Sequence, residues 1–214
     1  CDYLDGTVAI AQNWGPPDGM DRIYYPFENK DGTARIVFDG FLTNRDELST
    51  LTNRDGPGGL ECDARIVLDM YGKYGLDFVS HLRGMFAFAL QDGKKMILAR
   101  DPFGLKPLYM ARGGDGTMCF ASEIKSLTFA GNITTFPPGN FLAINGGMIP
   151  IKFNQYFSTL GELGDVTAFD SMAGCLKDML AVIVSKNIRE DENVGSLLSG
   201  GIDSSVVTAH AAAC

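Results

Sequence analysis

Short runs of apolar residues, broken by Gly, Asn, Asp and Pro, dominate the chain up to residue 150. This pattern is typical of strands joined by tight turns. Residues 34–39 (ARIVFD) are predicted to form a strand that ends in a turn at Gly40. Residues 84–91 and 95–101 predict a hairpin turned at Asp92-Gly93. A further strand is predicted at 116–122, and a further hairpin over 137–151.

Apolar positions at helical spacing occur in three other stretches. Residues 44–51 begin with Asn44, a residue type that caps helices, and continue with helix formers. Residues 64–75 form an amphipathic pattern that ends at Gly72 or Gly75. A third helix is predicted from Ser171 to about Lys186, and its apolar side consists of Met172, Cys175, Leu176, Met179, Leu180 and Ile183.

The pattern changes near residue 158, so two domains are expected. Residues 1–157 predict an α+β domain, and residues 158–170 are the candidate linker. Residues 171–214 predict the first β-α unit of a parallel-sheet α/β domain, with an apolar strand at 194–198 between two helices. Because one strand cannot form a sheet, we expect the chain to be a fragment whose second domain continues past Cys214.

Composition narrows the function classes. The chain has 214 residues, of which 45% are hydrophobic, and this content predicts a globular fold with a core. A net charge of −8 argues against a nucleic-acid partner. No apolar run has the length of a membrane span. Five scattered cysteines without a C-x-x-C pair favour reduced thiols and the cytoplasm. With only His81 and His210 available, a Ser-His-Asp or Cys-His site is not expected.

The strongest chemical signal is VGSLLSGGIDSS, residues 194–205. Backbone N–H groups of a Gly-rich turn and the positive end of the following helix together bind phosphate. We expect Asp203 to hold Mg²⁺, and the residues around the nucleotide to be Leu198, Ser199, Gly200, Gly201 and Ser204. No G-K-[ST] follows, so this is not a Walker A loop. A structural βα turn with an acidic cap is the alternative interpretation.

Several stretches, taken in order, resemble glutamine-dependent asparagine synthetase. They are FDGFLTNRDEL (38–48), LRGMFAFAL (82–90), ARDPFGLKPLY (99–109), FASEIKSL (120–127), PPGNF (137–141), Gln155-Tyr156 and DENVGSLLSGGIDSS (191–205). The resemblance covers residues 34–214. It implies a class II glutamine amidotransferase domain with the N-terminal-nucleophile fold, an αββα sandwich, over 1–157. It also implies the start of an ATP-pyrophosphatase domain over 171–214.

The resemblance also implies a reaction. An N-terminal cysteine, whose own α-amine acts as the base, releases ammonia from glutamine. The ammonia then reacts with an aspartyl-adenylate made from aspartate and MgATP, so that AMP and pyrophosphate leave. Glutamine and aspartate are the implied substrates, and ATP and Mg²⁺ the implied cofactors. A homodimer is a further expectation for the assembly. We expect the parent protein to be a ligase and the chain alone to be inactive as a synthetase.

Two alignments of the first residues remain open. In one, Cys1 is the nucleophile and residues 14–18 (WGPPD) replace the family's R-G-P-D. In the other, residues 7–14 (TVAIAQNW) match a later family segment, so that Cys1 is only the first residue of a fragment and Trp14 stands where an arginine binds the substrate carboxylate. Strand content and the distance to Asp39 favour the second alignment.

The glutamine site departs from the family at its oxyanion pair. The family has Asn and Gly there, whereas this chain has Asp39 and Gly40. A carboxylate repels a developing oxyanion, and losing one oxyanion donor already costs about 10² to 10³ in rate. Asp63 matches the family residue that binds the glutamine amine. We therefore expect glutamine hydrolysis to be weak or lost; alternatively, Asp39 caps a turn beside Gly40.

Two other functions remain open. A β-lactam-synthetase-like enzyme would use the same loop to adenylate another carboxylate, with an inactive glutamine domain. A non-catalytic scaffold is the second alternative. Elsewhere in the chain, we expect Arg100 and Asp101 to form a structural ion pair at a strand end.

Overall fold

The structure is a computed structural model that describes residues 2–4, 8–12, 26–52, 63–145, 153–157, 169–188 and 194–214. The chain divides into two compact units, Cys1–Thr159 and Leu160–Cys214. The first unit contains the described strands, and the second contains two helices.

A six-stranded antiparallel sheet forms the centre of the first unit. Its strand order is β11-β10-β6-β5-β4-β3. The strands are β3 (Phe27–Glu28), β4 (Ala34–Leu42), β5 (Gly84–Asp92), β6 (Lys95–Arg100), β10 (Asn140–Asn145) and β11 (Asn154–Gln155). The predicted hairpin of β5 and β6 is confirmed, with Gly93 at a positive φ of 55° in its turn. A separate pair consists of β1 (Asp2–Leu4) and β2 (Ala9–Ala11).

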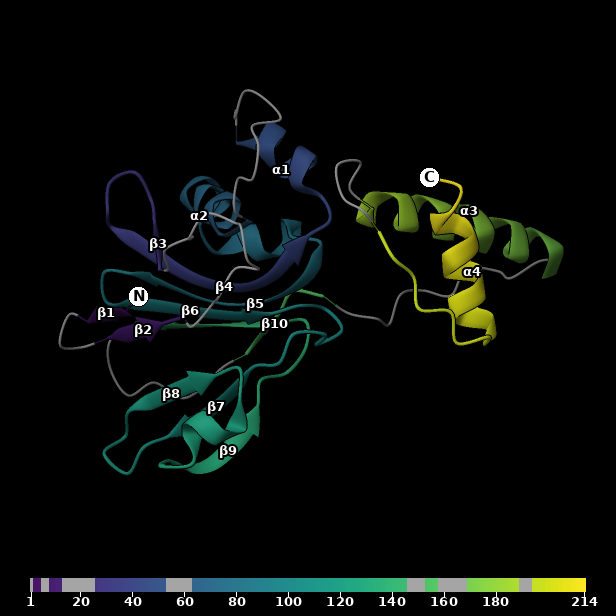
Figure 1. The fold of residues 1–214 in the computed structure, drawn as a ribbon. Coiled ribbons are helices and arrows are strands. Elements are labelled where there is room, and N and C mark those ends of the chain that lie inside the picture. Colours follow the sequence, from purple (N-terminus) through teal and green to yellow (C-terminus); the bar gives the residue numbers. More distant parts are fainter. Residues whose placement is uncertain are drawn as a thin grey trace. The chain divides into compact units, whose positions relative to one another are not determined.

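Helices cover one face of this sheet (Figure 1). They are α1 (Arg45–Leu51), α2 (Asp63–Tyr74) and the 3-10 helix η1 (Gly75–His81). Ile36, Phe38 and Phe86 point to this side because side chains alternate along a strand, and they join the core that α2 completes. Asn44 occupies the N-cap of α1 as predicted, but its side chain makes no capping bond and instead contacts residues 81 and 83.

A second, three-stranded sheet lies against the other face (Figure 1). Its order is β8-β7-β9, with β7 (Tyr109–Arg112), β8 (Met118–Ala121) and β9 (Gly131–Thr135). Val37, Leu98, Met110 and Phe136 fill the space between the sheets. Within the described residues, the outer layer on the smaller sheet is the 3-10 helix η2 (Ile124–Leu127), which buries Leu127.

The predicted turn at Gly40 is wrong, because β4 continues through this residue to Leu42 and pairs with β5 throughout. Gly40 has a φ of 132°, and a Cβ there would lie 1.9 Å from the carbonyl oxygen of Met85. Gly84 on the facing strand has a φ of 140°, and its Cβ would lie 2.2 Å from the carbonyl oxygen of Phe41. The two glycines therefore allow the two backbones to approach closely. In the sequence, a glycine with this role looks the same as the glycine of a turn.

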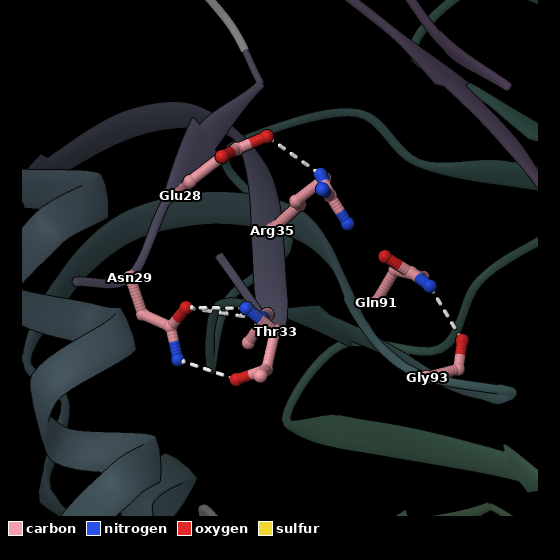
Figure 2. A network of polar contacts seen from close by, with 7 residues as sticks. Glu28, Asn29, Thr33, Arg35, Gln91 and Gly93 are labelled. Atoms are coloured by element: carbon pink, nitrogen blue, oxygen red, sulfur yellow. Dashed lines mark hydrogen bonds and ion pairs between the residues drawn. The ribbon is translucent and has the colours of Figure 1, made fainter. Parts of the chain in front are cut away.

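Polar side chains close the turns at the far end of β4 and β5 (Figure 2). The Asn29 side-chain oxygen accepts hydrogen bonds from the backbone N–H groups of Thr33 and Ala34, at 2.9 and 3.1 Å. Arg35 forms an ion pair of 2.7 Å with Glu28. These local bonds set the register of β3 against β4.

The second unit contains α3 (Phe169–Asn187) and α4 (Ile202–Ala211). The helix predicted over 171–186 is confirmed, but its apolar side is exposed at Leu176 and Met179. The strand predicted at 194–198 is not formed, because a strand needs a hydrogen-bonded neighbour and the described residues provide none. In the described part of the chain, no helix has both the length and the apolar character required to cross a membrane.

The close approach of β4 and β5 makes Gly84→Ala a sharp test of the sheet. We expect the variant to lose about 2 kcal/mol or more of unfolding free energy, because alanine at this φ is strained and its Cβ meets a backbone atom. Gly72→Ala in α2 is the control; it has open space and should be neutral or slightly stabilising. Denaturant unfolding measures both, and equal midpoints would contradict the geometry.

Candidate functional site

Arg100, the last residue of β6, organises the loop that follows it. Its guanidinium donates three hydrogen bonds to backbone carbonyl oxygens: Nε to Lys106 at 2.7 Å, Nη1 to Phe136 at 2.7 Å and Nη2 to Gly104 at 2.8 Å. The residue is buried. A planar group with five N–H donors can hold several carbonyls at once, so Arg100 joins the loop to the start of the β9–β10 connection.

Asp101 holds the same loop from its amide side. It is completely buried, and its carboxylate accepts the backbone N–H groups of Phe103 and Leu105 at 3.0 Å and of Lys106 at 2.9 Å. The predicted ion pair between Arg100 and Asp101 is wrong: within the described residues, no ion pair joins them. Both charges are satisfied by backbone groups, five of them in this loop and the sixth at Phe136.

Tyr156 and Gly139 complete the support of this loop. The Tyr156 hydroxyl donates to the carbonyl oxygen of Arg100 at 2.6 Å, and the Gly139 N–H donates to that of Asp101 at 3.0 Å. Burial, and then the charge of Asp101, raise the pKa of Tyr156 above its ordinary value. Residues from β6, the β9–β10 connection and the segment after β11 thus meet at one loop.

Asp39 lies in β4, opposite Ala87 of β5, and reaches this loop. Its carboxylate forms an ion pair with Lys106, with Nζ 2.8 Å from Oδ1. Both side chains are partly exposed. The alternative interpretation of Asp39 as a turn-capping residue is wrong, because Asp39 lies inside a strand and its carboxylate binds an ammonium group 67 residues away.

Asp63, the first residue of α2, is also ion-paired. It is buried, and Arg45 approaches both carboxylate oxygens, with Nε 2.5 Å from Oδ1 and Nη2 2.8 Å from Oδ2. The backbone N–H of Leu42 donates to Oδ2 at 2.9 Å. Asp63 therefore ties the end of β4 to the starts of α1 and α2, and its predicted contact with a glutamine amine remains a prediction.

Two side-chain contacts near this site were not predicted from the sequence. Lys106 lies in the family-like stretch 99–109, but nothing in the neighbouring sequence indicates that its partner is Asp39. The Gln12 side-chain amide donates to the carbonyl oxygen of Phe38 at 2.8 Å and accepts its N–H at 3.0 Å, so it extends the ladder beside β4. Cys1 and Trp14, on which the open alignment depends, lie outside the described residues.

The serine-rich loop of the second unit is held by its own hydroxyl groups. Ser199 and Ser204 hydroxyls are 2.8 Å apart, and Ser204 and Ser205 donate to the carbonyl oxygen of Gly201 at 3.1 and 2.7 Å. Gly200 has a φ of 83°, a conformation that favours glycine. The predicted residues Leu198, Ser199, Gly200, Gly201, Asp203 and Ser204 thus form one turn and the first turn of α4.

Asp203 can contribute to an Mg²⁺ site only together with other ligands. It is exposed in the first turn of α4. Across the described ranges, no three His, Cys, Asp or Glu side chains gather in a way that could hold a metal. This single carboxylate fits Mg²⁺, which proteins commonly hold through one or two carboxylates and the phosphates of a substrate.

Two family comparisons match different parts of the chain. The family described as "Glutamine amidotransferase domain" matches residues 19–129. The family described as "Asparagine synthase" matches residues 176–214, which contain the serine-rich loop. The two matches follow one another in the order that the sequence predicts.

Curated relatives agree with these matches. The chain is 36% identical over 191 residues to "Asparagine synthetase [glutamine-hydrolyzing]" of Zea mays, which covers 87% of this chain and 31% of the relative. It is 34% identical over 193 residues to "Asparagine synthetase [glutamine-hydrolyzing] 2" of Arabidopsis thaliana, covering 87% and 32%. The chain therefore spans about a third of the length of these relatives, and the predicted resemblance to their family is confirmed.

A solved structure supports the fold. Glutamine phosphoribosylpyrophosphate (PRPP) amidotransferase from B. subtilis, complexed with ADP and GMP, matches with a TM-score of 0.50 and 18% identity. The match covers 87% of this chain and 46% of that chain. This likeness confirms the predicted α+β fold of the N-terminal-nucleophile type.

Tyr156 allows the loop support to be tested by pH. We expect Tyr156→Phe to lose about 1 kcal/mol of unfolding free energy at pH 7, because it removes a partly buried hydrogen bond. An unfolded tyrosine loses its proton near pH 10, whereas folded Tyr156 keeps it because its pKa is raised. The unfolded state then binds fewer protons than the native state, so wild-type stability falls as the pH rises above about 10.

The Tyr156→Phe variant lacks this loss. The difference in unfolding free energy between the wild type and the variant should therefore narrow from pH 7 to pH 11. The pKa of Tyr71 is also raised, by burial and by Asp92, but Tyr71 is present in both proteins and changes their unfolding free energies equally. Denaturant titrations at each pH measure the difference. A constant difference would show that Tyr156 titrates as it does in the unfolded chain.

Proposed function

We propose, from the premise that this chain belongs to the family of glutamine amidotransferase domains, that the protein carrying it is a glutamine-dependent asparagine synthetase. The observation that carries this proposal is the order of two matches on one chain. An amidotransferase match over 19–129 is followed by an asparagine synthase match over 176–214. The chain corresponds to about a third of its curated relatives, so the complete reaction is proposed for the protein in its natural length.

The proposed reaction joins two half-reactions. In the first, glutamine and water give glutamate and ammonia. In the second, a carboxylate oxygen of aspartate attacks the α-phosphorus of ATP and pyrophosphate leaves; ammonia then attacks the acyl carbon and AMP leaves. Both half-reactions balance in atoms and electrons without any oxidant or further reactant.

The serine-rich loop is the part of this chain that we assign to ATP. Its glycines let the backbone approach phosphate closely, its hydroxyls donate hydrogen bonds, and the N-terminal end of α4 attracts negative charge. Mg²⁺, when bound, supplies positive charge that stabilises the leaving pyrophosphate. We assign Asp203 as the residue of this chain that binds it.

The glutamine half-reaction is proposed for the first unit, with Gly40 and Asp39 at the oxyanion position and Asp63 near the substrate amine. Cys1 is the nucleophile if the first alignment of the N-terminal residues holds. Because Asp39 brings a carboxylate where a donor is needed, we propose that glutamine turnover is slow.

The free thiols of Cys119, Cys175 and Cys214 support a reducing compartment such as the cytoplasm. A homodimer is the proposed assembly.

One observation favours a second candidate. Asp63 is engaged in an ion pair with Arg45, so its carboxylate does not stand free for a substrate amine. This supports a β-lactam-synthetase-like protein, in which the first unit no longer hydrolyses glutamine and the loop adenylates another carboxylate. The identity of the adenylated acid therefore separates the two candidates.

The test is pyrophosphate release by the protein in its natural length, with MgATP and a panel of carboxylates. We expect release with aspartate, and asparagine formation when glutamine or ammonium is added. Asp203→Asn should lower the rate by about 100-fold, because it removes the charge assigned to Mg²⁺.

The matched control is Asp178→Asn, which neutralises an exposed aspartate in α3 of the same unit and should leave the rate unchanged. Release with another carboxylate but not with aspartate would replace the leading proposal by the second. No release with any carboxylate would remove both.

A further inference from the structure

Lys106 is held in place more firmly than a surface residue requires. Buried Arg100 binds its carbonyl oxygen at 2.7 Å, and fully buried Asp101 binds its N–H at 2.9 Å. Its neighbours Phe103 and Leu105 are 67% and 59% exposed, so the loop itself lies at the surface. Two buried charged side chains thus fix the backbone of one lysine in an otherwise exposed loop.

The ion pair of Lys106 adds little to stability. The ion pair of Lys106 with Asp39 is partly exposed on both sides, with exposed side-chain fractions of 31% and 43%. Ion pairs of this kind contribute little to folding, because water screens them and both side chains lose freedom. The burial of Arg100 and Asp101, by contrast, requires that their charges be satisfied fully. Arg100 and Asp101 therefore stabilise the loop, whereas the contact of Lys106 with Asp39 that the loop geometry allows is itself worth little to the fold.

The ammonium lies where the glutamine site needs positive charge. Asp39 directly precedes Gly40, and this pair occupies the proposed oxyanion position. An unpaired carboxylate there would oppose the negative charge that develops on the amide oxygen of glutamine. Lys106 Nζ lies 2.8 Å from the Asp39 carboxylate, so the positive charge of the lysine largely cancels the negative charge of the aspartate. Within the described residues, Asp39 is the only hydrogen-bond partner of this ammonium, so two of its three N–H groups have no acceptor among those residues.

We infer that Lys106 is a positioning residue that neutralises Asp39 at the oxyanion position and so preserves glutamine hydrolysis in this chain. The inference rests on the function proposed above for the first unit. Arg100 and Asp101 act through Lys106 by fixing its backbone. The aspartate that replaces the family's asparagine is thus compensated within the same protein, by a lysine that itself stands in the family-like stretch ARDPFGLKPLY. In a site with asparagine, this lysine has no carboxylate to neutralise.

The test is a double-mutant cycle on glutamine hydrolysis, measured as kcat and KM of the protein in its natural length. Lys106→Met alone should lower kcat by about 100-fold, because it leaves the Asp39 charge uncompensated. Asp39→Asn should raise kcat above that of the wild type. In the Asp39→Asn background, Lys106→Met should change kcat by less than about threefold, because the charge that Lys106 neutralises is gone.

Lys125→Met is the matched control. Lys125 is an exposed lysine of the same unit that also pairs with a carboxylate, that of Glu123 at 2.5 Å, and its loss should leave kcat unchanged. Lys106→Arg should retain most of the activity, since it keeps the charge. Thermal unfolding of each variant accompanies the kinetics, and midpoints close to that of the wild type are expected.

Three results would overturn the inference while leaving the proposed function in place. One is an equal loss of kcat from Lys106→Met in both backgrounds, which is the mark of a structural role. The second is no loss in the wild-type background. The third is an inactive wild type with an active Asp39→Asn protein. If no variant, Asp39→Asn included, hydrolyses glutamine, then the proposed glutaminase is itself wrong and the inference falls with it.

Discussion

The first unit depends on two adjacent buried charges that bind backbone groups and not each other. Arg100 satisfies three carbonyl oxygens and Asp101 three N–H groups, most of them in the loop of residues 102–107. An irregular loop beside a core normally carries backbone groups that need water or secondary structure. Here one guanidinium and one carboxylate bind these backbone groups in place of water or secondary structure. The loop therefore has a defined shape, and the distance from Lys106 to Asp39 follows from it.

The two candidate sites are built on different physical grounds. The site around Asp39 is assembled from distant segments: β4 with its close approach to β5, the loop after β6, and Tyr156 beyond β11. The serine-rich loop is local, because its hydroxyls bond to groups within a few residues. The first arrangement depends on the whole unit being folded. The second needs only a turn and the start of a helix, and it matches a family over 176–214.

Sequence reasoning predicted what local pattern determines. The helices near 64–75 and 171–186, the β5–β6 hairpin and the serine-rich turn all follow from spacing or turn chemistry within a short stretch. It failed where tertiary contacts decide. Gly40 has the composition of a turn but serves the approach of two strands. The bond between Asp39 and Lys106 joins segments that no periodicity connects. The apolar run at 194–198 lacks a pairing partner among the described residues.

Amide hydrogen exchange measures directly whether buried charges fix the backbone of this exposed loop. Phe103 and Leu105 expose most of their side chains, yet their N–H groups are bound to the Asp101 carboxylate. We expect these amides, with that of Lys106, to exchange at least about 100-fold more slowly than in an unfolded chain. Exchange at the rate of an unfolded chain, in an otherwise protected sheet, would contradict it.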